Sequence, residues 1–373
     1  MKIAIVTEDL VGQGVQYVTA MTARSFARHG WNVDVIVSQY HRKLLEQGQR
    51  SFDLTPGVRL LYMPFVRARW NVLFLRDYIK RTNADIVLAE TGTYAKAIAL
   101  ATIGLSRKNL PHLVQLQHGN GPEYSRCRWW RWLGALKFWM LYRKFSILLS
   151  VNRTAMERSR EYAALTPRLR FDVVHNACVD EVFREKRSRP PLHPWLINKN
   201  VPTFVAAGSY TPGKCFGLLL RAMTVVRDRG VRARVIIFGR GYEESDYRKY
   251  ISANRLEEWV SIGGFTDQLP AELQTSDGLI SASNEESFGL TIAEALACGK
   301  PVVSADAPYG PREILADGKY GRLIPVNNLC ALADAIVDLA QGRVPAPPDE
   351  SWERFTIEAV ERRYFDVLGM LLK

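Results

Sequence analysis

Short apolar runs alternate with amphipathic stretches along this chain, and turn residues separate them. The first unit has an apolar strand at 2–8, a glycine-bearing turn at 12–15, a helix at 16–30 and a second strand at 32–38. The same pattern predicts further strands at 59–63, 85–90, 113–117, 147–152, 172–175, 202–207, 234–238, 259–264, 278–283, 302–305 and 321–324. Strands that alternate with helices indicate an α/β fold with parallel sheets.

The chain is long enough for two domains. It has 373 residues, of which 47% are hydrophobic and 24% charged, so it contains material for two cores of ordinary size. The stretch 188–195 carries three prolines and reads as an extended connection. We therefore expect a first domain at 1–185, a second at 200–348 and a terminal helix at 351–373.

The stretch 277–305 contains the main candidate for a functional site, two carboxylates around the start of one helix. An apolar strand is followed by Glu286, then by a helix that contains Glu294, and then by another strand. Amides at the start of this helix, near 288–291, suit a diphosphate because the amino end of a helix is electropositive. The two carboxylates suit hydroxyl groups, with Glu286 on a sugar and Glu294 on a ribose. This pattern predicts a nucleotide-sugar site.

A family resemblance rests on the same residues. Glu286 and Glu294 in the spacing Glu-x7-Glu, with Ser287-Phe288-Gly289 between them and Gly299-Lys300-Pro301-Val302-Val303 behind, resemble the donor signature of the retaining GT-B glycosyltransferases of family four. This resemblance implies two Rossmann-like domains that face each other across a cleft. It also implies a C-terminal helix that crosses back to the N-terminal, acceptor-side domain.

The resemblance also assigns roles to individual residues. Lys214 matches a family lysine directed at the diphosphate, where its charge stabilises the departing group. Ser209 stands where the family has an arginine, and Arg240 is a candidate to compensate. The donor-binding residues that it implies are Gly14, Ser209, Lys214, Arg240, Phe265, Glu286, Phe288, Gly289, Leu290 and Glu294. The catalytic residues that it implies are His118, Lys214 and Glu286.

Two of these residues lie in the first half of the chain. Gly14 resembles part of the family's glycine pair that lets the donor come close, with Gln13 in place of the first glycine. A turn glycine is the plain alternative. His118 follows a predicted strand and resembles the family histidine near sugar and acceptor, whereas a lone histidine is more often structural.

The sequence indicates neither a metal nor a cofactor. It has no Asp-x-Asp motif and no histidine pair, and its five cysteines are scattered without a Cys-x-x-Cys pair. We expect transfer without a metal, with a UDP-sugar favoured over a GDP-sugar. The amino-terminal MKIAIV reads as a buried strand rather than a secretory signal, so a cytoplasmic location is expected.

Positive charge is concentrated in the first half. Residues 1–180 carry 26 Lys+Arg and 13 Asp+Glu, a net +13 against +12 for the whole chain, which leaves −1 for the remainder. Lipid headgroups, nucleic acid or a phosphorylated acceptor would each suit this charge, and a face that aids solubility is the alternative. With the resemblance, we expect no nucleic-acid partner.

Two segments mix basic and aromatic residues. The segment 126–144 holds six basic residues, four tryptophans and no acid, and 67–81 repeats the mixture. Both suit the anionic surface of a membrane, on its inner face, although a core helix with a basic edge is equally compatible.

The expected function is transfer of a sugar, with retention, from a nucleoside diphosphate sugar to a hydroxyl of a glycan or lipid-linked acceptor in bacterial cell-surface polysaccharide synthesis. A nucleotide-sugar epimerase or a phosphorylase on the same fold is the alternative. A non-enzymatic binding protein is a third.

Overall fold

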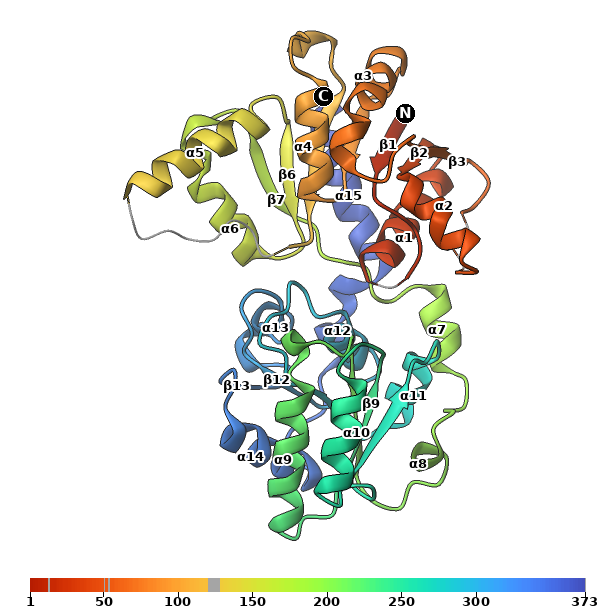
Figure 1. Ribbon diagram of the computed structural model, residues 1–373, viewed down its shortest axis with the longest axis vertical. Coiled ribbons are helices and arrows are strands. Elements are labelled where there is room, and N and C mark those ends of the chain that lie inside the picture. Colours follow the sequence, from red (N-terminus) through yellow and green to blue (C-terminus); the bar gives the residue numbers. More distant parts are fainter. Residues whose placement is uncertain (13, 50, 53, 120–127, 373) are drawn as a thin grey trace. The chain divides into compact units, whose positions relative to one another are not determined.

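The computed structural model describes residues 1–12, 14–49, 51–52, 54–119 and 128–372, which form two compact units (Figure 1). Unit 1 comprises Met1–Ala177 with Glu358–Lys373, and unit 2 comprises Cys178–Ile357. Each unit is built on one parallel sheet whose strands are joined by helices. The predicted α/β class with two Rossmann-like domains is therefore confirmed.

Unit 1 contains, among its described residues, a seven-stranded sheet in the order β3-β2-β1-β4-β5-β6-β7, with every neighbouring pair parallel. Its central strands are apolar and buried, as expected when helices cover both faces of a parallel sheet. The strands are β1 Lys2–Val6, β2 Asn32–Val37, β3 Val58–Tyr62, β4 Ile86–Ala89, β5 His112–Gln117, β6 Ile147–Ser150 and β7 Arg170–Val173. The helices are α1 Val15–Arg28, α2 Gln39–Glu46, α3 Val72–Arg81, α4 Gly92–Ala101, α5 Arg128–Tyr142, α6 Arg153–Glu161 and α15 Ile357–Leu372.

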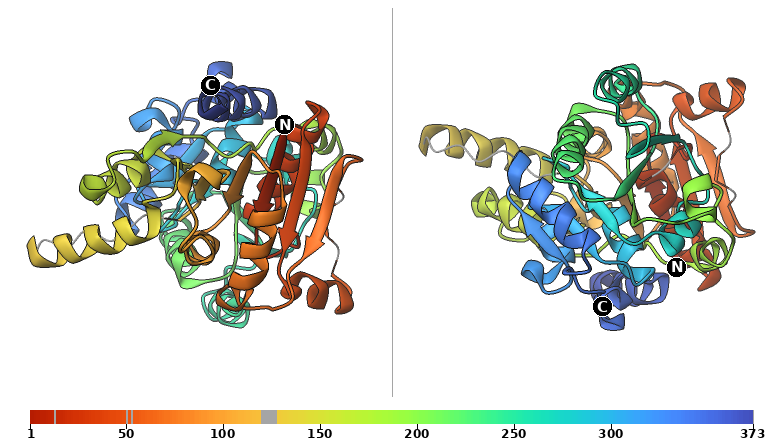
Figure 2. Two further views of the ribbon diagram at one scale, coloured as in Figure 1. Left: turned by 90° about the horizontal axis from the view of Figure 1, so that it is seen from above. Right: turned by 90° about the horizontal axis from the view of Figure 1, so that it is seen from below.

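Helices α15 and α5 of unit 1 differ in how they lie against the rest of the unit. α15 packs on α1, where the ring of Tyr364 lies 5.6 Å from that of Phe26 at 79°. In contrast, α5 extends away from the sheet (Figure 2). The strand order reverses between β1 and β4, so the carboxyl ends of these strands border the crevice where open α/β sheets bind ligands.

Unit 2 has a six-stranded parallel sheet in the order β10-β9-β8-β11-β12-β13 among the residues described. The order reverses between β8 and β11. The strands are β8 Thr203–Ala207, β9 Arg234–Phe238, β10 Val260–Gly264, β11 Leu279–Ser281, β12 Val302–Ala305 and β13 Arg322–Ile324. The helices are α7 Glu181–Arg187, α8 Pro194–Ile197, α9 Phe216–Asp228, α10 Glu244–Ala253, α11 Leu269–Thr275, α12 Leu290–Ala297, α13 Gly310–Ile314 and α14 Leu329–Ala340.

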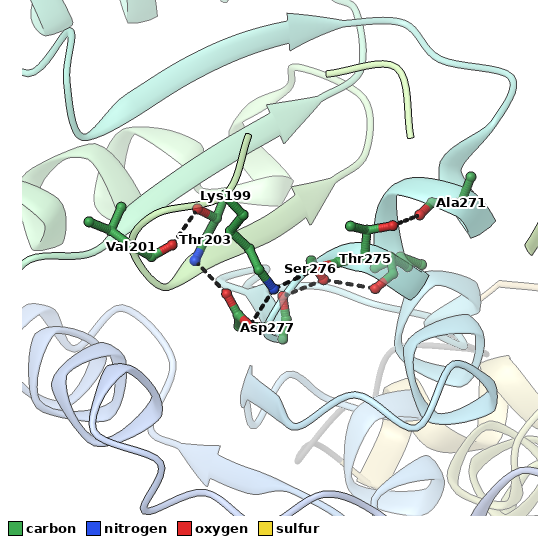
Figure 3. Close-up of polar contacts among 9 residues, drawn as sticks. Lys199, Val201, Thr203, Ala271, Thr275, Ser276 and Asp277 are labelled. Carbon is green, nitrogen blue, oxygen red and sulfur yellow. Dashed lines mark hydrogen bonds and ion pairs between the residues drawn. The ribbon is translucent and has the colours of Figure 1, made fainter. Parts of the chain in front are cut away.

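Asp277 fixes the two strands at this reversal. Its Oδ2 accepts a hydrogen bond from the backbone N of Thr203 at 2.8 Å, and its Oδ1 lies 2.7 Å from Nζ of Lys199 (Figure 3). The same ammonium donates to the carbonyl of Thr275 at 3.0 Å. These bonds hold the amino ends of β8 and β11 together, and they thereby set the loops that leave the opposite ends.

The terminal helix begins later than predicted. Helix was expected from residue 351, but α15 starts at Ile357. The backbone of Phe355 accepts from the amides of Cys178 and Val179, and Ile357 N donates to the carbonyl of Val179 at 2.9 Å. Because these backbone groups pair with residues 178 and 179, they do not form helical bonds.

The division between the units falls at Ala177/Cys178, whereas the linker composition pointed to 185–200. The difference arises because α7 packs against α11 of unit 2. Lys186 Nζ also donates to the carbonyl of Asp267 at 2.7 Å, so α7 groups with the second unit.

Candidate active site

Lys214 and Glu286 form an ion pair across the strand reversal of unit 2. Lys214 ends a 3-10 turn, Pro212–Lys214, that follows β8, and Glu286 lies in the loop that follows β11. The Lys214 ammonium contacts Oε2 of Glu286, and the two side chains keep 25% and 16% of their surface exposed. The pair is therefore fixed in place and accessible from solvent.

Backbone contacts hold the loop after β8 next to the loop after β11. The amide of Asn284 donates to the carbonyl of Gly213 at 3.0 Å, which ties the loop after β11 to the loop after β8. Cys215 adopts a left-handed conformation with φ 52° and starts α9 directly behind Lys214. The lysine is thus positioned by the fold rather than by its side-chain partner alone.

The start of α12 lies beside this pair. Gly289 caps the helix with φ 106°, and a Cβ built on it would lie 3.5 Å from Cγ of Glu286. Leu290 is the first helical residue, and Gly289 has no side chain that could cap the helix, so the electropositive amino end suits an anion.

Phe288 and Gly310 shape the approach to this helix. A Cβ on Gly310 would lie 1.7 Å from the Phe288 carbonyl oxygen, so only glycine fits there. The Phe288 ring is buried and packs on Phe355 with ring centroids 5.5 Å apart. Its side chain therefore belongs to the core, and only its backbone can face a ligand.

Glu294 lies inside α12 in a partly buried position. Burial, and to a smaller extent the negative charge of Asp180, raises the pKa of Glu294 to about 7. Asp180 itself accepts a hydrogen bond from the amide of Phe183 at 2.7 Å and caps α7. A desolvated carboxyl of this kind gains from a hydroxyl donor such as a ribose.

The loops after β8, β9 and β10 bring the remaining predicted residues to the same edge of the sheet. The Arg240 guanidinium carbon lies 4.9 Å from the ring centroid of Phe265, which is 49% exposed. The amide of Tyr210 donates to the carbonyl of Arg240 at 2.9 Å, and Ser209 Oγ lies 3.4 Å from Oγ1 of Thr211. Ser209 offers only a hydroxyl at this position.

In unit 1, Gly14 caps α1 with φ 74° in the loop that follows β1. Gln13, named beside it in the sequence, lies outside the described residues. A buried acid helps to hold this loop, because Asp9 Oδ1 accepts from the amide of Val11 at 2.8 Å.

His118 pairs with a residue that the sequence analysis did not select. Its Nε2 lies 2.7 Å from Oε2 of Glu90, whose side chain is fully buried at the end of β4. The other Glu90 oxygen and Nδ1 of His118 are buried without a hydrogen-bond partner in the described part of the chain. An acid that directly follows an apolar strand was the signal that could have identified Glu90.

These two residues line a large cavity of unit 1. Its volume is about 1490 Å³, and it extends beside α4, α5 and α6. Hydrophobic side chains of α4 and α5, such as Leu100 and Leu141, form much of its wall. The sequence analysis did not predict this cavity.

Family models match both halves of the chain. A model described as "Glycosyltransferase Family 4" matches residues 12–181, and one described as "Glycosyl transferases group 1" matches residues 193–358. Together they span nearly all of the two units.

Curated relatives match over part of their length. The chain is 36% identical over 120 residues, 32% of this chain and 18% of the relative, to poly(glycerol-phosphate) alpha-glucosyltransferase of Bacillus subtilis. It is 31% identical over 215 residues, 55% of this chain and 43% of the relative, to poly(ribitol-phosphate) alpha-N-acetylglucosaminyltransferase of Staphylococcus aureus. The chain thus spans less than half the length of these two relatives.

Solved structures share the fold. A crystal structure of Anabaena HepE in complex with UDP and glucose superposes with a TM-score of 0.72 at 19% identity, over 99% of this chain and 100% of that one. No helix in the described ranges is long and apolar enough to cross a bilayer. Because one glycosyltransferase model matches each half and the GT-B fold extends over nearly the whole length, the chain belongs to the GT-B glycosyltransferases of family four.

Proposed function

We propose that this protein is a hexosyltransferase that moves a sugar from a nucleoside diphosphate sugar to a hydroxyl group, with retention at the anomeric carbon. The observation that carries the proposal is the Lys214–Glu286 pair at the strand reversal of unit 2, beside the amino end of α12. This arrangement sets a cation, a carboxylate and helix amides around one point, which suits a sugar diphosphate.

Each donor group has a partner in this proposal. The diphosphate meets the amides of Gly289 and Leu290 and the ammonium of Lys214. The sugar hydroxyls donate to Glu286, and the ribose hydroxyls donate to Glu294. Arg240 and Phe265 hold the base, because their exposed stacked pair offers a flat cationic and aromatic surface. A UDP-sugar is favoured over a GDP-sugar.

Lys214 supplies the charge that a metal supplies in other transferases. As the bond between the anomeric carbon and the diphosphate oxygen breaks, negative charge collects on the diphosphate, and a fixed ammonium stabilises it. The acceptor hydroxyl attacks on the face from which the diphosphate leaves. Its proton passes to the departing diphosphate oxygen, so configuration is retained and no metal is required.

The acceptor is a hydroxyl of a glycan or of a lipid-linked glycan in bacterial cell-surface polysaccharide synthesis. The two relatives above are named as transferases for poly(glycerol-phosphate) and poly(ribitol-phosphate), and these names support the assignment. His118 and its partner Glu90 are placed on the acceptor side, because Nδ1 and Oε1, buried and without a partner among the described residues, can each take one hydrogen bond.

An association with the cytoplasmic face of an anionic membrane completes the proposal. Trp70 and Leu73 are 53% and 78% exposed, and the guanidinium carbons of Arg67 and Arg69 lie 5.4 and 5.8 Å from the Trp70 ring. An exposed aromatic and leucine flanked by arginines suits headgroup depth. In the segment 126–144, the side chains of residues 126–131 lie outside the described residues.

Incubation of the purified protein with a panel of nucleoside diphosphate sugars tests the proposal. One nucleotide should raise the melting temperature, because a ligand that binds only the folded state stabilises it. With an acceptor, the product should carry the anomeric configuration of the donor, read by nuclear magnetic resonance. Conversion of the donor sugar without an acceptor would instead identify an epimerase, and binding without turnover would identify a binding protein.

A further inference from the structure

The cavity of unit 1 changes character along its length. In a β-α-β unit the helix runs back from the carboxyl edge of the sheet to its amino edge, so α4 starts beside Glu90 and ends toward Ile103. Ten residues at 1.5 Å each give α4 a length of roughly 15 Å. The cavity therefore extends from the polar pair Glu90 and His118 along a helix of this length.

Unpaired cations come next along the wall. Lys96 and Lys137 each lie five residues before the last residue of their helices, α4 and α5, and both line the cavity. Neither forms an ion pair within the described ranges, and among the described lining residues Glu90, engaged by His118, is the one acid. This level of the cavity therefore presents uncompensated positive charge.

Apolar side chains follow the cations. Ala99 and Leu100 lie three and four residues after Lys96, the spacing that places residues along one face of a helix, and Ile103 lies in the turn that follows α4. On α5, Met140 and Leu141 follow Lys137 at three and four residues. Leu100, Ile103 and Met140 remain 50%, 55% and 55% exposed, so unit 1 leaves an apolar surface uncovered here.

The polar groups of the floor are already satisfied. Tyr142 donates to Gln115 in a short hydrogen bond, and Ser159 Oγ donates to Oε1 of Gln117 at 2.9 Å. The Lys144 ammonium donates hydrogen bonds to backbone carbonyls, including that of Leu105 at 2.9 Å. Polar demand therefore remains at Glu90 and His118 and at the two lysines. A further lining cation, Arg143, lies 5.0 Å from the centroid of the Trp139 ring, and the apolar side chains of the wall suit hydrocarbon.

We propose that this cavity binds the acceptor as a lipid that carries a phosphate group between its hydroxyl-bearing head and its hydrocarbon chain. The head lies at Glu90 and His118, the phosphate at Lys96 and Lys137, and the chain along Leu100, Ile103 and Met140. The volume of about 1490 Å³ exceeds the roughly 300–1,000 Å³ of pockets for small ligands, as a long chain requires. This inference rests on the proposed sugar transfer and names the acceptor class.

A single lipid is a different occupant from a membrane surface or a free phosphate. A surface would rest on Trp70 and Leu73, which do not line the cavity although their segment packs on α4, and it needs no interior volume. A free phosphate would use the two lysines and leave the apolar wall uncovered. The order of polar, cationic and apolar levels matches one amphipathic anion lying lengthwise.

Calorimetric titration of the full chain with inorganic phosphate and with butyl, octyl and dodecyl phosphate, each below its micelle concentration, tests the inference. Affinity should rise by about a hundredfold or more from octyl to dodecyl phosphate, because four methylenes are added and each buried methylene adds about fourfold. Ile103→Asp should abolish the gain with chain length, and Lys96→Glu with Lys137→Glu should weaken all the phosphates. Ile197→Asp and Lys249→Glu, at comparably exposed sites of unit 2, should bind as the natural protein does.

Affinity that does not depend on chain length, or dodecyl phosphate binding that survives Ile103→Asp, would overturn the inference. So would binding to phosphatidylglycerol vesicles without binding to monomeric dodecyl phosphate, since that result assigns the face to a membrane surface. The rise in melting temperature with a nucleotide, measured on Ile103→Asp, separates the two proposals. If the rise persists while the chain-length series is flat, only the acceptor site is wrong; if no nucleotide stabilises any variant, the proposed sugar transfer fails.

Discussion

His118 Nε2 lies 2.7 Å from Oε2 of Glu90, and the two residues follow neighbouring parallel strands, β5 and β4. Glu90 is fully buried, so its carboxylate fixes both the ring orientation and the tautomer of His118. A positioned imidazole whose second nitrogen has no partner in the part of the chain that the structure describes is suited to meet a sugar or acceptor hydroxyl.

Glu90→Gln should lower kcat by about tenfold or more while the KM for the donor stays close to its original value, because the amide no longer holds His118 in one orientation. Steady-state kinetics measures the two constants. Glu157→Gln, on an exposed face of α6, is the matched control. A change in donor KM with kcat unaltered would assign Glu90 to donor binding instead.

Removing the Lys214 ammonium should reduce kcat by about a hundredfold in Lys214→Ala, with a smaller effect on donor affinity, because the charge acts mainly on the departing diphosphate. Single-turnover rates and nucleotide titrations separate the two effects. Lys249→Ala, whose side chain is 78% exposed, should behave as the natural protein. Equal losses in rate and affinity would indicate simple binding.

The Lys214–Glu286 contact also predicts non-additivity. Glu286→Gln and Lys214→Ala combined should differ from the sum of the single changes by about 1 kcal/mol or more in the free energy of activation, because the two side chains touch. Glu285→Gln, at the exposed neighbouring position, should add independently to Lys214→Ala. Additive effects for Lys214 and Glu286 would show that each acts alone.

Much of unit 2 follows from the sequence because its residues occupy standard positions. Apolar strands that alternate with helices predict a parallel sheet, and the structure adds the strand order with its reversal between β8 and β11. Lys214 and Glu286 directly follow those two strands, so their meeting is a consequence of topology. The role of Gly310 is not visible in the same way, because its contact with the carbonyl of Phe288 joins two loops separated in sequence.

Other features depend on contacts that local patterns do not encode. Residues 351–356 read as helix, yet their end pairs with Cys178 and Val179 and delays α15. The segment 126–144 was equally compatible with a helix on a membrane surface and with a core helix with a basic edge, and its Lys137 and Leu141 line the cavity beside α4. Helical spacing gives the face of each helix, and only the packing shows which two faces meet.

Gly310→Ala should destabilise the protein by about 1–3 kcal/mol and weaken nucleotide binding. The added Cβ would lie 1.7 Å from the Phe288 carbonyl oxygen, so the backbone just before α12 would have to shift. Chemical denaturation and nucleotide titration measure the two effects. Gly217→Ala, inside α9 with no atom near its Cβ position, should be neutral or slightly stabilising. Unchanged nucleotide affinity in Gly310→Ala would separate this loop from the donor site.

Replacement of Arg67 and Arg69 by glutamine should lower the affinity for phosphatidylglycerol vesicles by about thirtyfold, because each basic residue near a charged leaflet contributes about 1 kcal/mol. Flotation at low and high salt measures binding, and salt should weaken the natural protein more than the double variant. Arg232→Gln, exposed in unit 2, is the control. Absence of flotation at low salt for the natural protein would exclude the membrane surface as a partner.

The Glu294 carboxyl predicts how stability depends on pH. Its pKa rises from 4.5 to about 7 on folding, so between these pH values the folded state binds more protons than the unfolded state. The Glu294 carboxyl therefore contributes on the order of 3 kcal/mol to the free energy of unfolding below about pH 4.5, and this contribution is lost as the pH rises through 7. Glu294→Gln, which cannot ionise, should remove this loss when the free energy of unfolding is measured across that range.

The same variant should bind the nucleotide about tenfold more weakly at pH 8, because a ribose hydroxyl donates more strongly to a carboxylate than to an amide. The difference between the two proteins should shrink toward pH 5, where the Glu294 carboxyl of the folded protein is protonated and, like the amide of the variant, carries no charge. Glu272→Gln would be a poor control, since that buried carboxylate accepts from the amides of Leu192 and His193; Glu257→Gln, on the surface, is the suitable one. A difference in nucleotide affinity that does not change with pH would remove Glu294 from the ribose contact.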